Sequence, residues 1–163
     1  MALNYKGTTL EILELIPFFI LFFISFNGNS VIDFNFFSIN VHYILVYYWV
    51  LRHPQSLGYG FIFISGIITD VVFGLPMGCT PLALLTIAGV AAYIRNVTVR
   101  VTLFTDWISF IPALLFANFI YFMALYFSNY SINYLDLFTN SIFTFIFYPI
   151  LWILFSLIKL TKT

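Results

Sequence analysis

Residues 70–84 read DVVFGLPMGCTPLAL: an aspartate in an otherwise apolar run, a break rich in glycine and proline, and a second apolar run. Asp70 is therefore an ionisable group inside a hydrophobic segment. The whole chain is 63% hydrophobic, 22% aromatic and only 7% charged, whereas about a quarter of the residues of a soluble domain are charged. So few polar residues cannot cover a soluble globule, and the composition predicts an integral membrane protein.

Six apolar stretches are candidate membrane helices, and no connection between them is long enough for a soluble domain. The longer stretches reach the ~20 residues that a helix needs to cross about 30 Å of hydrocarbon. They lack the strict alternation of barrel strands. The sequence thus predicts an all-α, polytopic membrane helix bundle of six transmembrane helices in one domain, residues 1–163, with spans at about 10–26, 36–51, 57–75, 80–94, 107–127 and 137–158.

The basic residues orient the predicted bundle. The loops after the first, third and fifth spans contain no Lys or Arg. Under the positive-inside rule the basic side of the membrane is cytoplasmic, which predicts that both termini are cytoplasmic. The six basic residues on that side are Lys6, Arg52, Arg95, Arg100, Lys159 and Lys162.

The sequence offers no pattern of catalytic or metal-binding residues. It contains one cysteine, Cys79, and two separated histidines, His42 and His53, and it has no Walker loop, G-x-S-x-G elbow or H-E-x-x-H motif. We therefore expect no catalytic residue, no cofactor, no metal site and no nucleic-acid partner. For His42, in the second span, we expect a bond to a neighbouring helix rather than a role as a ligand or proton relay.

Gly66, Asp70 and Gly74 are spaced by four residues, which places them on one stripe of a helix, and Gly78 extends the series. Small residues let membrane helices approach closely. These four residues are the candidate helix-packing or partner interface. Two interpretations stay open: a tight contact within the bundle, or a surface where Asp70 lines a small cavity or meets a partner's helix. In both, we expect Asp70 to be protonated or held by hydroxyl and backbone donors, because an unpaired carboxylate in lipid is costly.

A longer pattern surrounds this stripe. It consists of Tyr48-Trp49-Val50-Leu51, Pro54, Gly60-Phe61, Gly66-Ile67-Ile68-x-Asp70-x-x-x-Gly74 and Gly78-x-x-x-Leu82-Ala83-Leu84. In order and spacing it resembles the MreD family, the rod-shape-determining inner-membrane proteins of bacteria. The resemblance implies a place in the bacterial inner membrane and a helix bundle similar to the substrate-binding subunits of energy-coupling-factor transporters. It also implies that Asp70 and Gly74 form the family signature.

The resemblance leads to a non-enzymatic membrane component of the cell-wall elongation complex that maintains rod shape. Such a protein would bind MreC and help to localise or regulate peptidoglycan synthesis, with MreB, RodA and the transpeptidase partner of RodA as further partners. The alternative is a substrate-binding membrane subunit of a vitamin or metal transporter, because fold does not determine function. That subunit would need several polar groups around an outward-facing pocket, and the outer half offers only Asp70, Thr69, Thr80 and Asn140. A third hypothesis, an intramembrane enzyme acting on lipid, lacks a paired nucleophile and base.

Overall fold

The computed structural model describes residues 5–27, 31–34, 37–54, 56–98, 102–130 and 134–160; side chains are described from residue 16 onward, except those of 31–37, 134 and 157–160. The described residues form six helices and one β-hairpin. These elements are α1 (Tyr5–Phe26), β1 (Val31–Phe34), β2 (Phe37–Asn40), α2 (Val41–Arg52), α3 (Tyr59–Phe73), α4 (Cys79–Val97), α5 (Leu103–Phe127) and α6 (Tyr134–Leu160).

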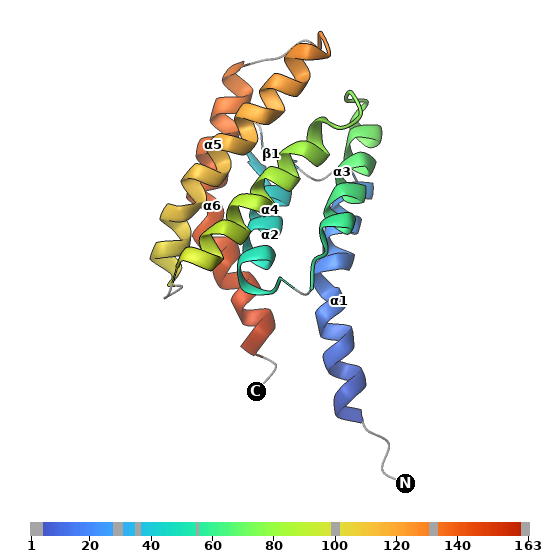
Figure 1. Ribbon diagram of the computed structural model, residues 1–163, viewed down its shortest axis with the longest axis vertical. Coiled ribbons are helices and arrows are strands. Elements are labelled where there is room, and N and C mark those ends of the chain that lie inside the picture. The colour runs from blue at the N-terminus through green and yellow to red at the C-terminus, as the bar shows by residue number, and fades with distance from the viewer. Residues whose placement is uncertain are drawn as a thin grey trace.

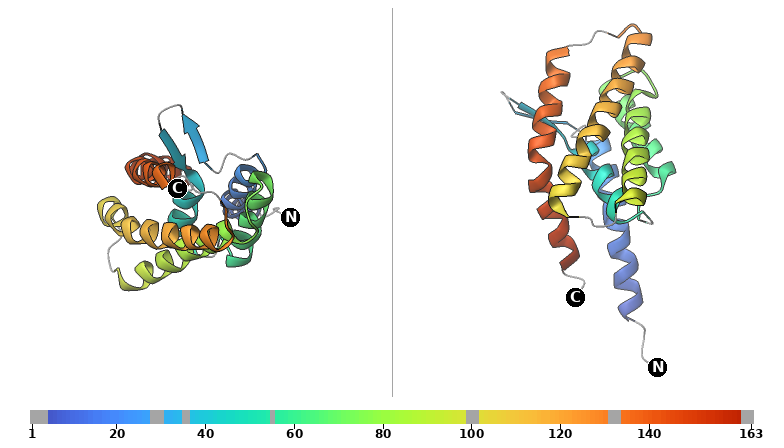
Figure 2. Two further views of the ribbon diagram at one scale, coloured as in Figure 1. Left: turned by 90° about the horizontal axis from the view of Figure 1, so that it is seen from above. Right: turned by 60° about the vertical axis from the view of Figure 1, so that its left-hand side comes forward.

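Successive helices run in opposite directions along the long axis of the bundle (Figure 1). α1 begins and α6 ends at the same end, which we call the terminal end, and α2 and α4 also end on that side. The α3–α4 and α5–α6 connections lie at the opposite end, which we call the distal end (Figures 1 and 2). The β-hairpin connects α1 to α2.

Three helices, α4, α5 and α6, are long and apolar enough to cross a membrane, judged by length and composition. The expected helical class is thus confirmed, and three of the helices have the length and composition that a membrane crossing needs. Two further apolar segments are shorter: Ile16–Phe26, which is the part of α1 whose side chains are described, and the 15-residue α3.

The second predicted span, 36–51, is wrong in its first part. Residues 37–40 form β2, which pairs antiparallel with β1. α2 begins only after Asn40, whose side-chain oxygen accepts a hydrogen bond from the N–H of Tyr43 at 3.2 Å and caps the helix. The 12 residues of α2 rise only about 18 Å, which is too short to cross the hydrocarbon alone.

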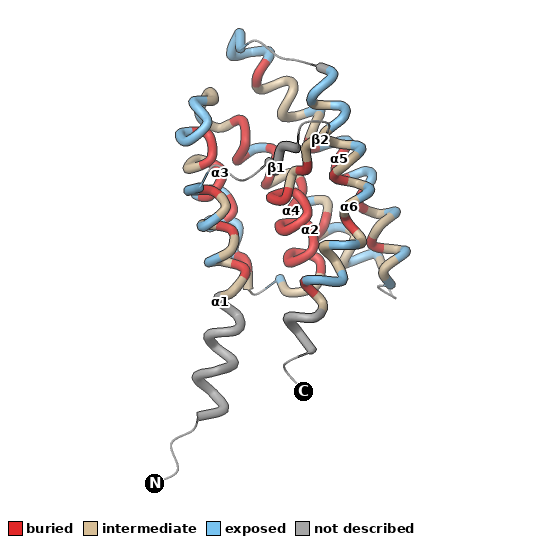
Figure 3. Tube along the Cα trace, turned by 180° about the vertical axis from the view of Figure 1, so that it is seen from behind, coloured by how far each residue is buried: buried red, intermediate tan, exposed pale blue. Residues whose placement is uncertain are grey.

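α2 is the core of the bundle. Its residues 41–51 are all buried, and the tube in Figure 3 is red along this helix. α1, α4, α5 and α6 all contact it. The ring of Tyr47 lies 4.8 Å from that of Phe110, which in turn stacks on Tyr148 at 4.7 Å between centroids. This aromatic cluster joins α2, α5 and α6.

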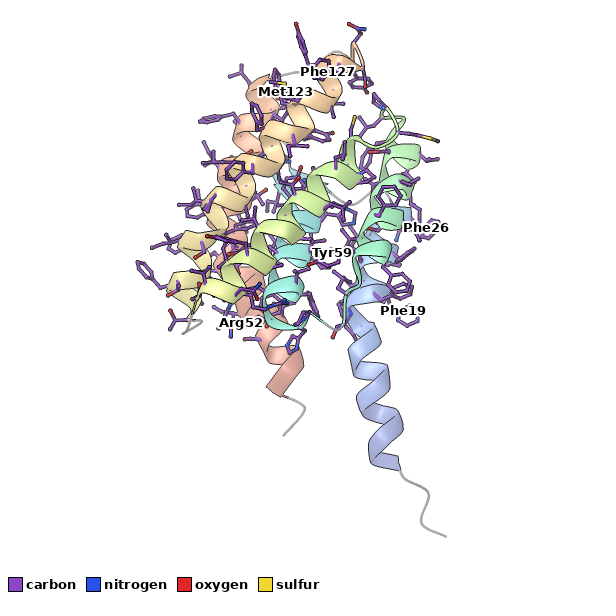
Figure 4. The ribbon with its side chains drawn as sticks, in the orientation of Figure 1. Phe19, Phe26, Arg52, Tyr59, Met123 and Phe127 are labelled. Carbon is purple, nitrogen blue, oxygen red and sulfur yellow. The ribbon has the colours of Figure 1, made fainter. Side chains whose placement is uncertain are left out.

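The outer helices each combine a buried face with an exposed apolar face. Phe19 and Phe26 of α1 are 63% and 64% exposed and project away from the bundle (Figure 4). Phe116 and Phe119 of α5 and Ile150 of α6 are likewise more than half exposed. Water would penalise an apolar surface of this extent, and hydrocarbon would not.

Candidate functional site

Asp70 holds the turn between α3 and α4. Its side chain is fully buried in the last turn of α3. One carboxylate oxygen, Oδ2, accepts a hydrogen bond from the N–H of Gly78 at 2.7 Å, and the other, Oδ1, accepts one from the N–H of Thr80 at 3.1 Å. The partners of Asp70 are therefore backbone donors, which is one of the two arrangements expected from the sequence.

These two bonds make Asp70 the cap of α4. The first N–H groups of a helix have no partner within the helix and carry the positive end of its dipole. Gly78, the N-cap residue of α4, has no side chain to satisfy them. The Asp70 carboxylate, from the preceding helix, supplies both the missing acceptors and a complementary charge. The negative charge of Asp70 is thus compensated by these N–H groups and the helix dipole, without a cation.

Gly66 lies at a close contact between α3 and α4. A Cβ atom built on Gly66 would lie 2.7 Å from both the Cα and the N of Pro81, which is shorter than real Cβ contacts. The main chains of the two helices touch at this point. Gly66 therefore takes part in the predicted close helix contact, and its neighbour is α4.

Gly74 and Gly78 have a different role from Gly66. A Cβ on either residue would meet no atom within 4 Å, but both have positive φ, +64° and +102°. α3 ends at Phe73 and Gly74 follows it, with the N–H of Gly74 bonded to the C=O of Val71 and the N–H of Leu75 to the C=O of Asp70. These bonds form a Schellman motif, which requires a left-handed residue. Gly74 thus lies beyond the helical stripe predicted from its spacing.

A second polar centre lies at the terminal end of the bundle. Asp106 is 2% exposed, and its Oδ2 accepts hydrogen bonds from Nη2 and Nε of Arg52 at 2.8 and 3.2 Å and from Nε1 of Trp152 at 3.1 Å. The Arg52 guanidinium also lies 5.3 Å from the centroid of the Trp152 ring. One carboxylate therefore connects α2, α5 and α6.

The predicted fifth span, 107–127, begins just after Asp106. The structure corrects this boundary, because α5 begins at Leu103 and buries Asp106 in its first turn. Thr102 was the missed signal: its hydroxyl accepts a hydrogen bond from the N–H of Thr105 at 3.3 Å and caps α5 there. Threonine before an apolar run is a usual helix start.

Polar groups of other helices also satisfy the ends of α2. At its start, the N–H of Asn40 donates to Oγ1 of Thr144 at 2.9 Å, and Thr144 donates to Oδ1 of Asn140 at 3.2 Å. At its end, Nη1 of Arg95 donates to the C=O of Val50 at 3.1 Å. Because α2 is buried, its terminal groups need protein partners in place of water.

His42 is bonded to a neighbouring helix, as expected. Its Nε2 lies 3.1 Å from Oγ of Ser25 in α1, and the Ser25 hydroxyl donates to the C=O of Leu21 at 2.8 Å. Cys79 begins α4 as a buried free thiol. Comparison with protein-family models, with curated proteins and with solved structures gives no match for this chain.

Proposed function

We propose that this chain is a non-enzymatic membrane scaffold of the bacterial cell-wall elongation complex, which binds an MreC-type partner and helps to localise or regulate peptidoglycan synthesis. Two independent supports carry the proposal. The first is the resemblance of residues 48–84 to the MreD family. The second is that several polar side chains form hydrogen bonds within the fold.

Three of the four polar side chains that could line an outward-facing ligand site are bonded inside the fold. Asp70 accepts the N–H groups of Gly78 and Thr80. The hydroxyl of Thr69 donates to the C=O of Ser65 at 2.9 Å, within its own helix, and the side-chain oxygen of Asn140 accepts from Thr144. A transport subunit for a hydrophilic substrate would need such groups free to bind it. This internal use favours a scaffold over the transporter alternative.

The proposal includes six membrane passages in the bacterial inner membrane. α1 and α3 would cross beside α4, α5 and α6, while α2 would form an interior passage continued by the β-hairpin. Arg52 and Arg95 end α2 and α4 at the terminal end of the bundle, and Figure 4 labels Arg52 there. With the positive-inside rule, that end and both termini are cytoplasmic. MreB would then approach from the terminal end, and RodA with its transpeptidase from within the membrane.

Co-purification tests the proposal directly. The chain and a tagged MreC-type protein from the same genome are co-expressed, extracted in mild detergent and captured through the tag. We expect stoichiometric capture of the chain and no vitamin or metal in the captured material by mass spectrometry and elemental analysis. A chain that carries a stoichiometric small ligand and ignores the MreC-type protein would instead establish the transport alternative.

A further inference from the structure

α3 is short for a helix that crosses a membrane. It contains 15 residues, Tyr59–Phe73, and the left-handed Gly74 ends it on the distal side. A helix rises about 1.5 Å per residue, so α3 is only about 22 Å long. The hydrocarbon of a typical bilayer is about 30 Å thick. The length of α3 therefore raises the question of where its two ends lie relative to the lipid.

The first turn of α3 leaves backbone donors without a partner. Its N-cap residue, Gly58, has no side-chain acceptor, and the C=O of Gly58 accepts the N–H groups of Phe61 and Ile62. The N–H groups of Tyr59 and Gly60 form no hydrogen bond with any described residue. Both residues are exposed. Water or lipid headgroups must therefore reach this end of the helix.

The last turn of α3 leaves backbone acceptors without a partner. The Schellman motif uses the C=O groups of Asp70 and Val71. The C=O of Val72 would bond to the N–H of residue 76 if the helix continued, but Pro76 has no N–H. Among the described residues, neither Val72 nor Phe73 has a partner for its C=O, and both are exposed. This end must also reach water or headgroups.

These two ends limit the thickness of the hydrocarbon beside α3. Lipid chains cannot bond to N–H or C=O groups, so the polar ends cannot lie among them. The N–H of Gly60 and the C=O of Val72 are about 18 Å apart along the helix. A bilayer that leaves both groups at its surface is therefore about 10 Å thinner here than the usual 30 Å.

The opposite side of the bundle does not require a thin bilayer. α5 and α6 contain 25 and 27 residues and are about 37 and 40 Å long, which covers a full bilayer even when they are tilted. Seen from above, α3 and α6 lie at opposite sides of the bundle (Figure 2). The α5–α6 connection also extends beyond the α3–α4 connection at the distal end (Figure 1). The demand for thinning is thus confined to the α3 side.

The side chains of α3 indicate that lipid covers its outer face. Its three polar side chains with hydroxyl or carboxylate groups inside the helix, Ser65, Thr69 and Asp70, are all buried. The exposed side chains between the two ends are all apolar: Phe61, Phe63, Ile64, Val71 and Val72. Hydrocarbon chains fit such a face, and water does not.

We infer that the outer face of α3 is a lipid-binding surface that thins the bilayer locally to about 20 Å and prefers phospholipids with short acyl chains. This inference rests on the proposed six passages, in which α3 crosses the membrane. Thinning on one side only gives the protein a lipid preference of its own, since a short hydrophobic helix sorts a protein toward thin membrane.

Nitroxide labels on α3 and α5 test the inference. Phe61→Cys and Val72→Cys place a label near each end of α3, and Ile108→Cys and Phe119→Cys are a matched pair in α5, the same number of positions apart. All four side chains are between 45% and 58% exposed. Cys79 is buried, and the unsubstituted protein shows whether it takes up any label.

Each labelled chain is reconstituted into phosphatidylcholine vesicles with monounsaturated chains of about 18 or about 22 carbons. Collisions with oxygen, which is enriched in hydrocarbon, and with a water-soluble nickel complex give the depth of each label. The unlabelled protein is also unfolded by heat in both lipids and in vesicles with chains of about 14 carbons.

We expect the labels at positions 61 and 72 to lie at the headgroup level in both lipids, because the unpaired backbone groups keep the headgroups there. A full bilayer of about 30 Å would instead place them about 6 Å inside the hydrocarbon. The labels at positions 108 and 119 should lie in hydrocarbon and become deeper in the longer-chain lipid. The unlabelled protein should have its highest unfolding temperature in the shortest-chain vesicles.

Three results would overturn the inference. If the two α3 labels lie in hydrocarbon and become deeper with chain length, as the α5 labels do, the bilayer is not thinned, and the six passages are unaffected. If neither oxygen nor the nickel complex reaches the α3 labels, a second copy of the chain covers this face in place of lipid. If both α3 labels are in open water, α3 does not cross the membrane, and the six-passage proposal fails with the inference.

Discussion

A buried carboxylate in this protein is stabilised by main-chain donors. Asp70 uses both of its oxygens to cap α4, and no cation is among its bonded partners in the described residues. Asp106, at the other end of the bundle, instead forms an ion pair with Arg52 and accepts a hydrogen bond from the indole N–H of Trp152. The two acids therefore differ in what their loss would leave behind: unpaired N–H groups in one case, an unpaired cation in the other.

Substitutions of Asp70 should separate its geometry from its charge. Asp70→Asn keeps one oxygen acceptor but turns an NH₂ group toward the second N–H, so we expect it to lose about 1–3 kcal/mol of folding free energy. Asp70→Leu leaves both N–H groups unpaired and should lose more, with failure of partner binding. Thermal unfolding in detergent measures the loss. The exposed Asp136→Asn is the control, and an Asp70→Leu protein as stable as that control would contradict the capping role.

Tyr148 offers a second test at a single atom. Its hydroxyl is fully buried and has no hydrogen-bond partner among the described residues. Tyr148→Phe removes that unsatisfied group and keeps the ring on Phe110, so stability should stay equal or rise by about 1 kcal/mol. Tyr148→Ala removes the ring and should cost about 3–5 kcal/mol. A clear loss of unfolding temperature in Tyr148→Phe would show that the hydroxyl is bonded.

At the scale of helices and strands, the close approach of α3 and α4 determines the geometry around the Asp70 cap. Gly66 removes the side chain that would separate the helices, Asp70 reaches across one turn later, and Gly74 and Gly78 allow the sharp connection. The three features depend on one another, because the carboxylate reaches the start of α4 only when the two helices are in contact.

Glycines of α3 provide a matched pair of substitutions for this contact. Gly66→Ala places a methyl group against the main chain at Pro81 and should cost about 1–3 kcal/mol, with Gly66→Leu worse. Gly60→Ala lies in the same helix, where a Cβ meets nothing within 4 Å, and should stabilise α3 by up to about 1 kcal/mol. Unfolding temperatures of the two alanine variants should therefore move in opposite directions. Equal shifts would show that α3 and α4 do not touch at Gly66.

At the scale of the whole molecule, the bundle surrounds a short apolar helix with longer ones. α2 has buried residues on all sides, and side chains from α4, α5 and α6 bond to its ends or to its last residue. A helix in such a position cannot move without breaking these contacts. The interior is therefore held rigidly, and the exposed apolar faces of the outer helices are the surfaces available to lipid and partners.

Reporter fusions should establish the number of crossings. With six passages, an alkaline phosphatase reporter joined after Met77 or Ser128 should be active in the periplasm, and one joined after His53 or Thr98 should be inactive. A fluorescent reporter that folds only in the cytoplasm should give the opposite pattern. If only α4, α5 and α6 cross, His53 and Met77 will report the same side, and the six-passage proposal will be wrong.

The sequence by itself determined the class of the protein and much of the α3–α4 contact. The scarcity of charge predicts membrane helices, the spacing of Gly66 and Asp70 predicts a close contact, and Pro76 with Gly78 predicts the tight connection. These features are local: composition, period and turn residues act within one or two turns of chain. They therefore show in the sequence without knowledge of the neighbours.

Only the tertiary structure showed that α2 is a buried interior helix, that Arg52 pairs with Asp106, and that Gly66 and Gly74 have different roles. A helix that is apolar on every side looks the same in sequence whether lipid or protein surrounds it, because both are hydrocarbon environments. Arg52 and Asp106 are far apart in the chain, and no local pattern brings them together. Gly74 shares the spacing of Gly66, yet α3 ends before it, since the bonds that close the Schellman motif depend on the path toward α4. Pairings across the fold arise from the packing of whole helices, which no short stretch of sequence contains.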